Sequence, residues 1–313
     1  LGGASLHASR SGIACLIAED EEEACALAAD ILGFLPDNNQ SSPPVEPTAD
    51  DPARLNPDLE SLVPDNPNRP YDMVKVIEEI VDDGIFMELF NSYAENIVIG
   101  FARLDGKTIG IVANQPKVLA GCLDIDASIK AARFIRTCDA FNIPLVTFED
   151  VPGFLPGVVQ EWGGIIRHGA KLLFAYAEAT VPKMTLVTRK AYGGAYLAMS
   201  CKHLQSDYNI AWPTAELAVM GAEGAVNIIH RREIAAADDD KKEETRLQLV
   251  EEYKSKFGDP YVAARNGWLD DVIEPEESRL RLIRALRILS SKREWSPPKL
   301  SLIHISEPTR RYR

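Results

Sequence analysis

The sequence predicts a layered α/β domain in which strands and helices alternate along the chain. Between residues 97 and 200, short apolar runs alternate with longer segments whose apolar residues recur at helical spacing. A hydrophobic fraction of 46% and a charged fraction of 26% over 313 residues are typical of a globular protein with a sizeable core. Glycine-rich loops follow two of the apolar runs, and α/β domains bind ligands at such strand ends.

The first 70 residues predict little regular structure beyond one helix. Residues 24–35 have helical composition, and the acidic run 19–23 would place carboxylates at the positive end of that helix. From residue 36 to residue 70 the composition shifts to Pro, Asn, Asp and Ser, which predicts a linker without a packed core. The predicted parts are therefore a leading segment (1–35), a linker (36–70) and a main domain (71–300).

The main domain opens with a predicted hairpin, since residues 97–104 and 108–113 flank the turn Asp105-Gly106. Residues 301–313 do not continue the pattern, and we expect them to be a non-native tail. Between the hairpin and the tail, the apolar spacing predicts a helix over 126–141, a strand over 144–148, a helix over 159–179, a strand over 184–188, a helix starting at 193, a charged helix over 238–257 and a final helix around 282–289.

The overall charge and the cysteine and histidine content exclude several classes of function. With 34 Lys and Arg against 47 Asp and Glu, the net charge is −13, which argues against a nucleic-acid-binding protein. The five cysteines form no CxxC pair, and this favours a reducing compartment, the cytoplasm or the mitochondrial matrix of a eukaryote. The five histidines share no metal-ligand spacing, and no apolar run is long enough to span a membrane. We therefore expect no metal, nucleic acid or membrane partner.

Residues 149–157, Glu-Asp-Val-Pro-Gly-Phe-Leu-Pro-Gly, form the first candidate ligand loop. An apolar strand ends in two carboxylates, and a loop with two prolines and two glycines then leads directly into a helix. Such a loop can present backbone N–H groups and an apolar floor to a ligand. The alternative is an ordinary tight connection between a strand and a helix.

Residues 189–196, Arg-Lys-Ala-Tyr-Gly-Gly-Ala-Tyr, form the second candidate loop and have the same order of strand, glycines and helix. Two glycines let the backbone approach a ligand, and a helix N-terminus directs free N–H groups and its positive dipole to one point. A developing enolate oxygen would be stabilised there, as in oxyanion holes. The alternative is close packing of the helix against the strand by glycine.

A third glycine-containing stretch, residues 211–225, is either a packed loop wall or a ligand contact. The sequence contains no G-x-S-x-G motif, and Ala195 follows the glycine pair where a nucleophilic Ser or Cys would be needed. No GxGxxG motif follows a strand. Catalysis by a nucleophile, a metal or a dinucleotide is therefore unsupported, which leaves backbone electrostatics in a crevice.

In their order and spacing, these three loops resemble the carboxyltransferase subunits of propionyl-CoA carboxylase and related biotin-dependent acyl-CoA carboxylases. Residues 131–136, 141–144 and 163–171 extend the resemblance, which runs from residue 1 to about residue 300. It implies a crotonase-like ββα superhelix of the ClpP/crotonase type, built as two homologous lobes. Residues 1–35 would be the end of the first lobe, which binds acyl-CoA and carries its own oxyanion hole upstream of Leu1. Residues 71–300 would be the second lobe, on the carboxybiotin side.

The resemblance also implies roles for individual residues. The backbone N–H groups of Gly194 and Ala195 would form the catalytic oxyanion hole for the ureido oxygen of biotin. Leu197 stands where propionyl-preferring members often have an acidic residue, so it would influence the choice of acyl chain. The implied cofactor-binding residues are Gly153, Phe154, Leu155, Gly157, Gly193 and Tyr196.

The implied reaction moves CO₂ from carboxybiotin, held on a separate carrier protein, to the α carbon of propionyl-CoA or acetyl-CoA. The biotin anion itself would remove the α-proton, so no side-chain base is needed. The implied partners are a biotin carboxylase or biotin carboxyl carrier subunit and further copies of the chain, with hexamers in relatives. Alternatives are a subunit of a sodium-pumping methylmalonyl-CoA decarboxylase, an inactive binding or assembly fragment and, less favoured because catalytic carboxylates are not evident, a crotonase-type hydratase.

Overall fold

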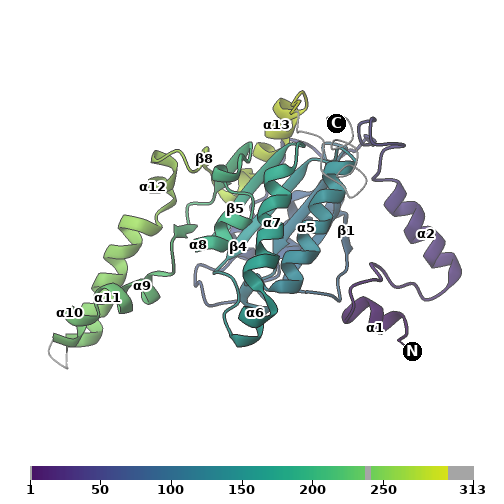
Figure 1. Cartoon of the computed structure of the whole chain (residues 1–313). Helices are drawn as coiled ribbons and strands as arrows, with labels where there is room; N and C mark the ends of the chain where they lie inside the picture. The colour runs from purple at the N-terminus through teal and green to yellow at the C-terminus, as the bar shows by residue number, and fades with distance from the viewer. Residues whose placement is uncertain (1, 237–240, 295–313) are drawn as a thin grey trace, which may run out of the picture.

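A mixed eight-stranded sheet forms the centre of the protein in this computed structural model, which describes residues 2–236 and 241–294 (Figure 1). The strand order is β1-β2-β3-β4-β5-β6-β8, and β7 pairs with β5 beyond the end of β6. The first three strands are antiparallel and the others run parallel to β3. Their bounds are Phe86–Leu89, Ile97–Leu104, Lys107–Asn114, Leu145–Val151, Lys183–Tyr192, Tyr208–Ala211, Glu216–Ala218 and Asp271–Val272 for β1 to β8.

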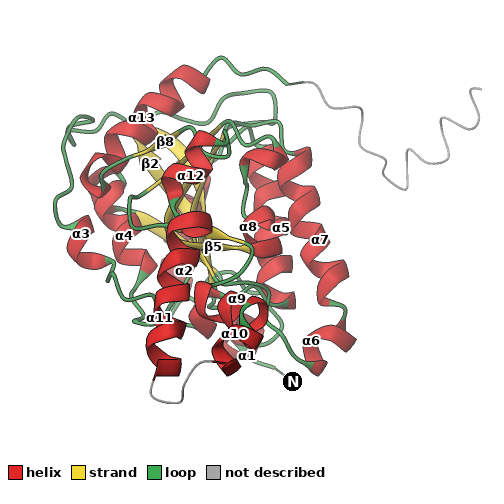
Figure 2. Ribbon diagram, turned by 90° about the vertical axis from the view of Figure 1, so that its left-hand side faces the viewer, coloured by secondary structure: helices red, strands yellow, loops and turns green. Residues whose placement is uncertain are grey.

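Helices cover both faces of the sheet, as Figure 2 shows from the side. On one face lie α5 (Ile125–Ala140), α7 (Ile165–Glu178) and α8 (Gly193–Ala198), which share a core with the inward side chains of β2, β3 and β4. On the other face, α3 (Leu59–Leu62), α4 (Met73–Ile80) and α13 (Ser278–Leu289) pack on the alternate side chains of the same strands. The expected α/β layering follows from this alternation, because successive residues of a strand point to opposite faces.

The two central strands are longer than predicted. β4 continues through Glu149 and Asp150 to Val151, and β5 continues through Arg189 and Lys190 to Tyr192. Every residue of both strands is buried. Charged residues at the end of an apolar run suggested that the strands stopped. The end of β4 instead pairs with β5, and the end of β5 pairs with both β4 and β7.

The helix predicted over residues 159–179 is two helices. α6 (Val158–Gly163) ends at Gly164, which has a φ of 86° in the left-handed region, and α7 begins directly after it. A left-handed glycine is a common helix C-cap because other residues strain in this conformation. The helix axis therefore changes direction at the glycine pair 163–164, between α6 and α7.

Residues 36–70 were expected to lack a packed core, and this part of the expectation is wrong. Leu59 and Val63 are buried in the same core as α4. The guanidinium of Arg54 donates hydrogen bonds to the carbonyl oxygens of Glu79 and Val81. The turn-rich composition was recognised correctly, but one short helix supplies enough apolar side chains to attach the segment to the domain. The domain boundaries themselves remain predictions.

The leading segment lies at one side of the domain (Figure 1). It contains α1 (Ala4–Ser9) and α2 (Glu21–Leu32), and the predicted helix therefore starts three residues earlier than expected. Asp20 caps α2 by accepting a hydrogen bond from the Glu23 N–H at 2.8 Å. Phe34, just after α2, stacks on Phe101 of β2 with ring centroids 5.6 Å apart.

At the opposite side, α9 (Ala222–Ile229), α10 (Arg231–Ala236) and α11 (Lys242–Tyr253) form a helical arm that projects from the sheet (Figure 1). Ala222, Val226, Leu249 and Val250 give this arm a small core of its own. The charged helix predicted over 238–257 begins at residue 242, and residues 238–240 lie outside the described ranges. The remaining helical elements are α12 (Pro260–Arg265), a π-helical turn (Lys254–Gly258) and 3₁₀ turns at Asp82–Gly84, Leu119–Gly121, Lys202–Leu204 and Pro275–Glu277.

Lys130 of α5 is a buried cation that fixes the connection between β1 and β2. Its ammonium donates hydrogen bonds to four backbone carbonyl oxygens in that connection. Burial lowers the pKa of Lys130 to about 8, while the nearby negative charges of Glu88 and Glu95 act in the opposite direction. The acceptors belong to Phe90, Tyr93, Ala94 and Ile97, at 2.9, 2.7, 3.3 and 2.8 Å.

Replacing Lys130 with methionine keeps the chain length and removes the ammonium. We expect Lys130→Met to lower the free energy of unfolding by about 2–4 kcal/mol, because several buried carbonyl oxygens lose their donor. Urea denaturation measures this loss. Lys75→Met, on the exposed side of α4, is the matched control and should stay within about 0.5 kcal/mol of the parent. Equal effects of the two substitutions would contradict a stabilising role for Lys130.

Candidate active site

The two glycine loops lie side by side at one edge of the sheet. β4 and β5 are parallel neighbours, so the loop after β4 and the start of α8 after β5 emerge at the same edge. A Cβ atom placed on Gly194 would lie 3.9 Å from Cε2 of Phe154. The structure therefore brings Phe154 and Gly194 together, as expected for two loops that line one crevice.

The short helix α8 presents an open face and a buried face. Gly194 and Leu197, three residues apart, are exposed, whereas Ala195 is buried. The N–H groups of Gly194 and Ala195 belong to the first turn, where helical N–H groups have no acceptor within the helix. Gly193 has a φ of 60°, and a Cβ there would lie 2.9 Å from the carbonyl oxygen of Val219. Only glycine fits at that position, so the entry to α8 is tightly constrained.

The loop from residue 152 to residue 157 is held by backbone hydrogen bonds on both sides of Phe154. The N–H of Leu123 donates to the carbonyl oxygen of Gly153 at 3.1 Å, and the N–H of Leu155 donates to that of Leu123 at 2.8 Å. Phe154 and Leu155 are half-buried, while Gly157 is exposed at the start of α6. The side chains of this loop thus sit on a rigid backbone rather than on a free loop.

Tyr196, which the sequence placed among the cofactor contacts, turns its side chain away from the open face of α8. Its ring is buried with Val187, Cys201 and Leu217, and its edge faces the His203 ring with centroids 6.5 Å apart. The Tyr196 side chain thus packs between α8 and the sheet, on the buried side of the helix. Helical geometry explains this, because Tyr196 lies two residues from Gly194 and so on the opposite side of the helix.

Asp150 and Arg189 form a buried ion pair that joins the ends of β4 and β5. The guanidinium Nε lies 3.0 Å from Oδ2 of Asp150, and both side chains are almost fully buried. The Arg189 guanidinium also lies 4.8 Å from the centroid of the Tyr71 ring. It donates to three further carbonyl oxygens, those of Pro64, Asn66 and Arg69, and so fastens the segment before α4 to this edge of the sheet.

Glu149 points to the other face of β4 from Asp150. Its side chain is fully buried, and neither carboxyl oxygen has a hydrogen-bond partner among the described residues. Burial, and next the charge of Asp150, raise the pKa of Glu149 well above its usual range. The hydroxyl of Tyr196 is likewise without a partner in the described part of the chain. The two carboxyl groups seen in the sequence are therefore separated: one is paired with arginine, and the other is buried with a raised pKa.

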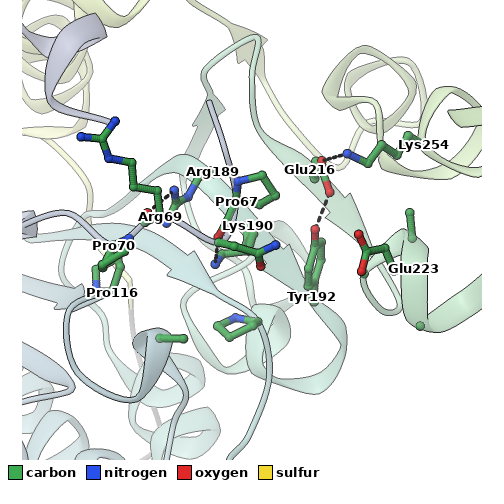
Figure 3. A pocket seen from close by; sticks show the side chains of 16 residues that line it. Pro67, Arg69, Pro70, Pro116, Arg189, Lys190, Tyr192, Glu216, Glu223 and Lys254 are labelled. Atoms are coloured by element: carbon green, nitrogen blue, oxygen red, sulfur yellow. Dashed lines mark hydrogen bonds and ion pairs between the residues drawn. The ribbon is translucent and has the colours of Figure 1, made fainter. Parts of the chain in front are cut away.

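A cavity of about 320 Å³ lies beside the start of α8 (Figure 3). On one wall the Tyr192 hydroxyl donates to Glu216, whose other carboxyl oxygen lies 3.2 Å from Nζ of Lys254. None of the nine residues that the sequence singled out lines this cavity. Its walls are Pro67, Asn68, Arg69, Pro70, Pro116, Ala120, Pro152, Arg189, Lys190, Tyr192, Glu216, Gly221, Ala222, Glu223, Gly224 and Lys254.

All three glycine-containing stretches of the sequence analysis contribute residues to this cavity, but that analysis did not single out Lys254 or the segment 67–70. Lys254 follows a helix with many charges, and nothing in its local pattern separates it from the other lysines. Residues 67–70 were assigned to a linker, although Nζ of Lys190 donates to the carbonyl oxygen of Pro67 at 2.9 Å. Only the folded chain shows that these segments meet.

Comparison with known proteins identifies the family. Residues 1–302 match the model of the carboxyl transferase domain. The chain belongs to this family. It is 57% identical over 300 residues to the carboxyltransferase subunit of propionyl-CoA carboxylase from Haloferax mediterranei, which covers 96% of this chain and 58% of the relative. It is 56% identical over 299 residues to methylmalonyl-CoA decarboxylase subunit alpha from Propionigenium modestum, covering 96% and 57%.

A solved structure confirms the expected crotonase-like fold. Transcarboxylase 12S, determined with methylmalonyl-CoA bound, superposes with a TM-score of 0.91 at 51% identity, covering 96% of this chain and 57% of that one. The resemblance predicted from the three loops is thus confirmed. The carboxyl transferase chain described here spans somewhat more than half the length of these relatives.

Within residues 2–236 and 241–294, no group of three or more His, Cys, Asp or Glu side chains could hold a metal ion. No helix in the same ranges is long and apolar enough to cross a membrane.

Glu149 gives the carboxyl transferase chain a testable pH dependence. Its pKa is raised in the folded protein, so its stabilising contribution is complete below the unfolded pKa and is lost as the pH rises through the folded pKa. Glu149→Gln removes the titration, and we expect its Tm to exceed that of the parent increasingly as the pH rises from about 5 to about 8. Thermal melts at several pH values test this, with the exposed Glu161→Gln as control. Parallel curves for parent and Glu149→Gln would show that Glu149 is not held neutral.

Proposed function

We propose that this chain is the carboxybiotin-side part of a biotin-dependent acyl-CoA carboxyltransferase. The observation that supports this most directly is the exposed glycine backbone at the start of α8 beside the ring of Phe154, in a chain of the carboxyl transferase family. Gly194 leaves open space in front of the first turn, where a side chain would otherwise stand. This is the kind of cradle that a planar ring with a polar oxygen needs.

Biotin, when presented by its carrier, supplies the carboxyl group that is transferred. The N–H groups of Gly194 and Ala195 donate to the ureido oxygen, and the dipole of the first turn adds to their effect. Gly153, Leu155, Gly157 and Gly193 are the further proposed contacts to biotin, through their backbone. Phe154 supplies an apolar wall, which lowers the local dielectric and so strengthens each hydrogen bond to the developing charge.

The two carboxyl groups at the end of β4 support a reaction without a side-chain base. Asp150 is committed to Arg189, and Glu149 is buried with a raised pKa. Neither is available to remove a proton from a substrate beside Gly194. Proton transfer between the two reactants themselves, with the protein stabilising negative charge, fits this arrangement.

Leu197 lies on the open face of α8, one turn after Gly194. We propose that it contributes to the choice of acyl chain through an apolar contact. Short acyl-CoA thioesters, propionyl-CoA or acetyl-CoA, are the proposed substrates. An apolar side chain here provides no hydrogen bond or charge to a polar acyl group.

A second copy of the chain is the proposed partner that completes the site. Val159 and Trp162 of α6 and Ile166 of α7 are 81%, 87% and 83% exposed, directly after the Phe154 loop. Exposed large apolar side chains that gather in one place mark protein interfaces. We propose that the first lobe of a neighbouring subunit covers them, within a homo-oligomer that also receives a biotin carboxyl carrier subunit.

A methylmalonyl-CoA decarboxylase subunit remains the second candidate. The 56% identity to the Propionigenium modestum protein is nearly the same as the identity to the propionyl-CoA carboxylase subunit. The same residues would then run the transfer in the opposite direction. A biotin carboxylase gene beside this one favours the carboxylase, and genes for membrane subunits favour the decarboxylase.

The oxyanion role of α8 is tested by Gly194→Val. We expect decarboxylation of methylmalonyl-CoA with free biotin by the full-length protein to fall at least about a hundredfold, because the valine methyl groups fill the space before the N–H groups. The fold should persist, since the first contact of a Cβ at this position is an ordinary 3.9 Å.

Gly3→Val is the matched control, because a Cβ at Gly3 meets nothing within 4 Å. Circular dichroism and thermal melting should be the same for both variants and the parent. A fully active Gly194→Val protein would refute the oxyanion assignment. A parent protein with no turnover would instead favour a binding or assembly module.

The proposed subunit interface is tested by Trp162→Lys. A charge placed in an apolar interface resists desolvation, so we expect a smaller assembly in size-exclusion chromatography with light scattering. Ile288→Lys changes an exposed isoleucine of α13 and serves as control. An unchanged molar mass for Trp162→Lys, at concentrations where the parent is oligomeric, would place the interface elsewhere.

A further inference from the structure

We propose that Gly169, in the middle of α7, is a positioning residue for the site in front of α8, and this inference rests on the proposed function. Its missing side chain leaves the space in which the ring of Phe154 lies. The ring in turn determines how much of the Gly194 backbone stays open. A residue on a helix that touches no substrate would thus control access to the oxyanion hole.

Gly169 destabilises helix α7, so its presence there calls for a structural explanation. Glycine inside a helix costs about 1 kcal/mol relative to alanine. Gly169 is buried within the fourteen-residue helix α7. A Cβ placed there would lie 2.8 Å from Cε1 and 2.9 Å from Cζ of Phe154, closer than a Cβ atom can approach a ring carbon. The ring therefore occupies the volume of the absent methyl group.

The opposite edge of the same ring lies at Gly194. Cε2 of Phe154 is 3.9 Å from the Cβ position of Gly194, while Cε1, on the other side of the ring, is the atom nearest to Gly169. The ring thus spans the gap between α7 and α8. Pressure on the Cε1 edge from α7 moves the Cε2 edge towards α8.

The backbone of Phe154 cannot retreat from such pressure. Leu123 accepts a hydrogen bond from the N–H of Leu155 and donates one to the carbonyl oxygen of Gly153. Phe154 itself forms a parallel bridge with Leu123. With the backbone held on both sides, only rotation about the side-chain bonds relieves a clash, and this rotation carries the ring over Gly194.

The test compares four variants of the full-length protein: Gly169→Ala, Phe154→Leu, their combination, and Gly258→Ala. Gly258 is a buried glycine at the end of the π-helical turn, where a Cβ meets nothing within 4 Å, so it controls for a glycine-to-alanine change without a clash. The readouts are kcat and KM for free biotin in methylmalonyl-CoA decarboxylation, KM for the acyl-CoA, and Tm. The amide chemical shift of Gly194 reports the position of the nearby ring.

We expect Gly169→Ala to lower kcat/KM for biotin about tenfold to a hundredfold, as small displacements in active sites do. KM for the acyl-CoA should not change, and Tm should equal or exceed that of the parent. The amide resonance of Gly194 should shift. The smaller leucine removes the clash. Adding Gly169→Ala to Phe154→Leu should therefore lower kcat/KM for biotin much less than adding Gly169→Ala to the parent does.

Parental kinetics and an unshifted Gly194 amide in Gly169→Ala would overturn the proposal. A parallel loss of activity and Tm, without recovery in the double variant, would also overturn it in favour of a structural role. If the parent itself shows no turnover, the proposed function fails, and the Gly194 amide shift alone then decides whether Gly169 positions the ring.

Discussion

The buried contact between Asp150 and Arg189 holds together the parts that form the site. It joins the last residues of β4 and β5, and the same guanidinium binds three carbonyl oxygens of residues 64–69. An ion pair with such low exposure must form nearly all of its possible hydrogen bonds. A buried charge that lacks a hydrogen-bond partner costs roughly several kcal/mol in desolvation. Four acceptors meet that requirement for the guanidinium, one carboxylate and three carbonyl oxygens, and the Tyr71 ring adds a cation–π contact.

This anchoring fits the proposal that backbone N–H groups, and not a side-chain base, serve the reaction. With Asp150 bound to arginine and Glu149 facing the opposite side of β4 in an apolar setting, the strand end provides no free carboxylate. The glycines that follow each strand then expose peptide groups at fixed positions. Gly193 is constrained by the carbonyl oxygen of Val219, and Phe154 by its bridge to Leu123. A site made of peptide groups needs such constraint, since a stabilising dipole must be oriented before charge develops.

Local pattern predicted the parts of the fold that depend on local interactions. The hairpin of β2 and β3 and helix α5 were located to within about one or two residues by turn chemistry and apolar spacing. The neighbourhood of Phe154 and Gly194 was also predictable, because parallel neighbouring strands bring their loops to one edge. The extensions of β4 and β5 were not, since a charged residue is buried in a strand only when a partner from elsewhere meets it.

Other features depend on direction or on distant segments. The orientation of Tyr196 requires knowing where α8 begins, because a shift of one residue turns a helix by about 100°. The packing of Leu59 depends on a surface formed by α4, α13 and the sheet together. The contact of Gly169 with Phe154 joins two segments whose separate patterns are those of an ordinary helix and an ordinary loop. Lys254 reaches Glu216 only because the helical arm returns to the sheet.

The arm formed by α9, α10 and α11 has its own apolar centre and joins the sheet near Gly221 and Lys254. Its root supplies one wall of the cavity in Figure 3, through Glu223 on one side and Lys254 on the other. A rotation of the arm as a rigid unit would therefore move Glu223 and Lys254 relative to the edge of the sheet where α8 begins. Such a movement would change the width of the opening while every strand of the sheet kept its place.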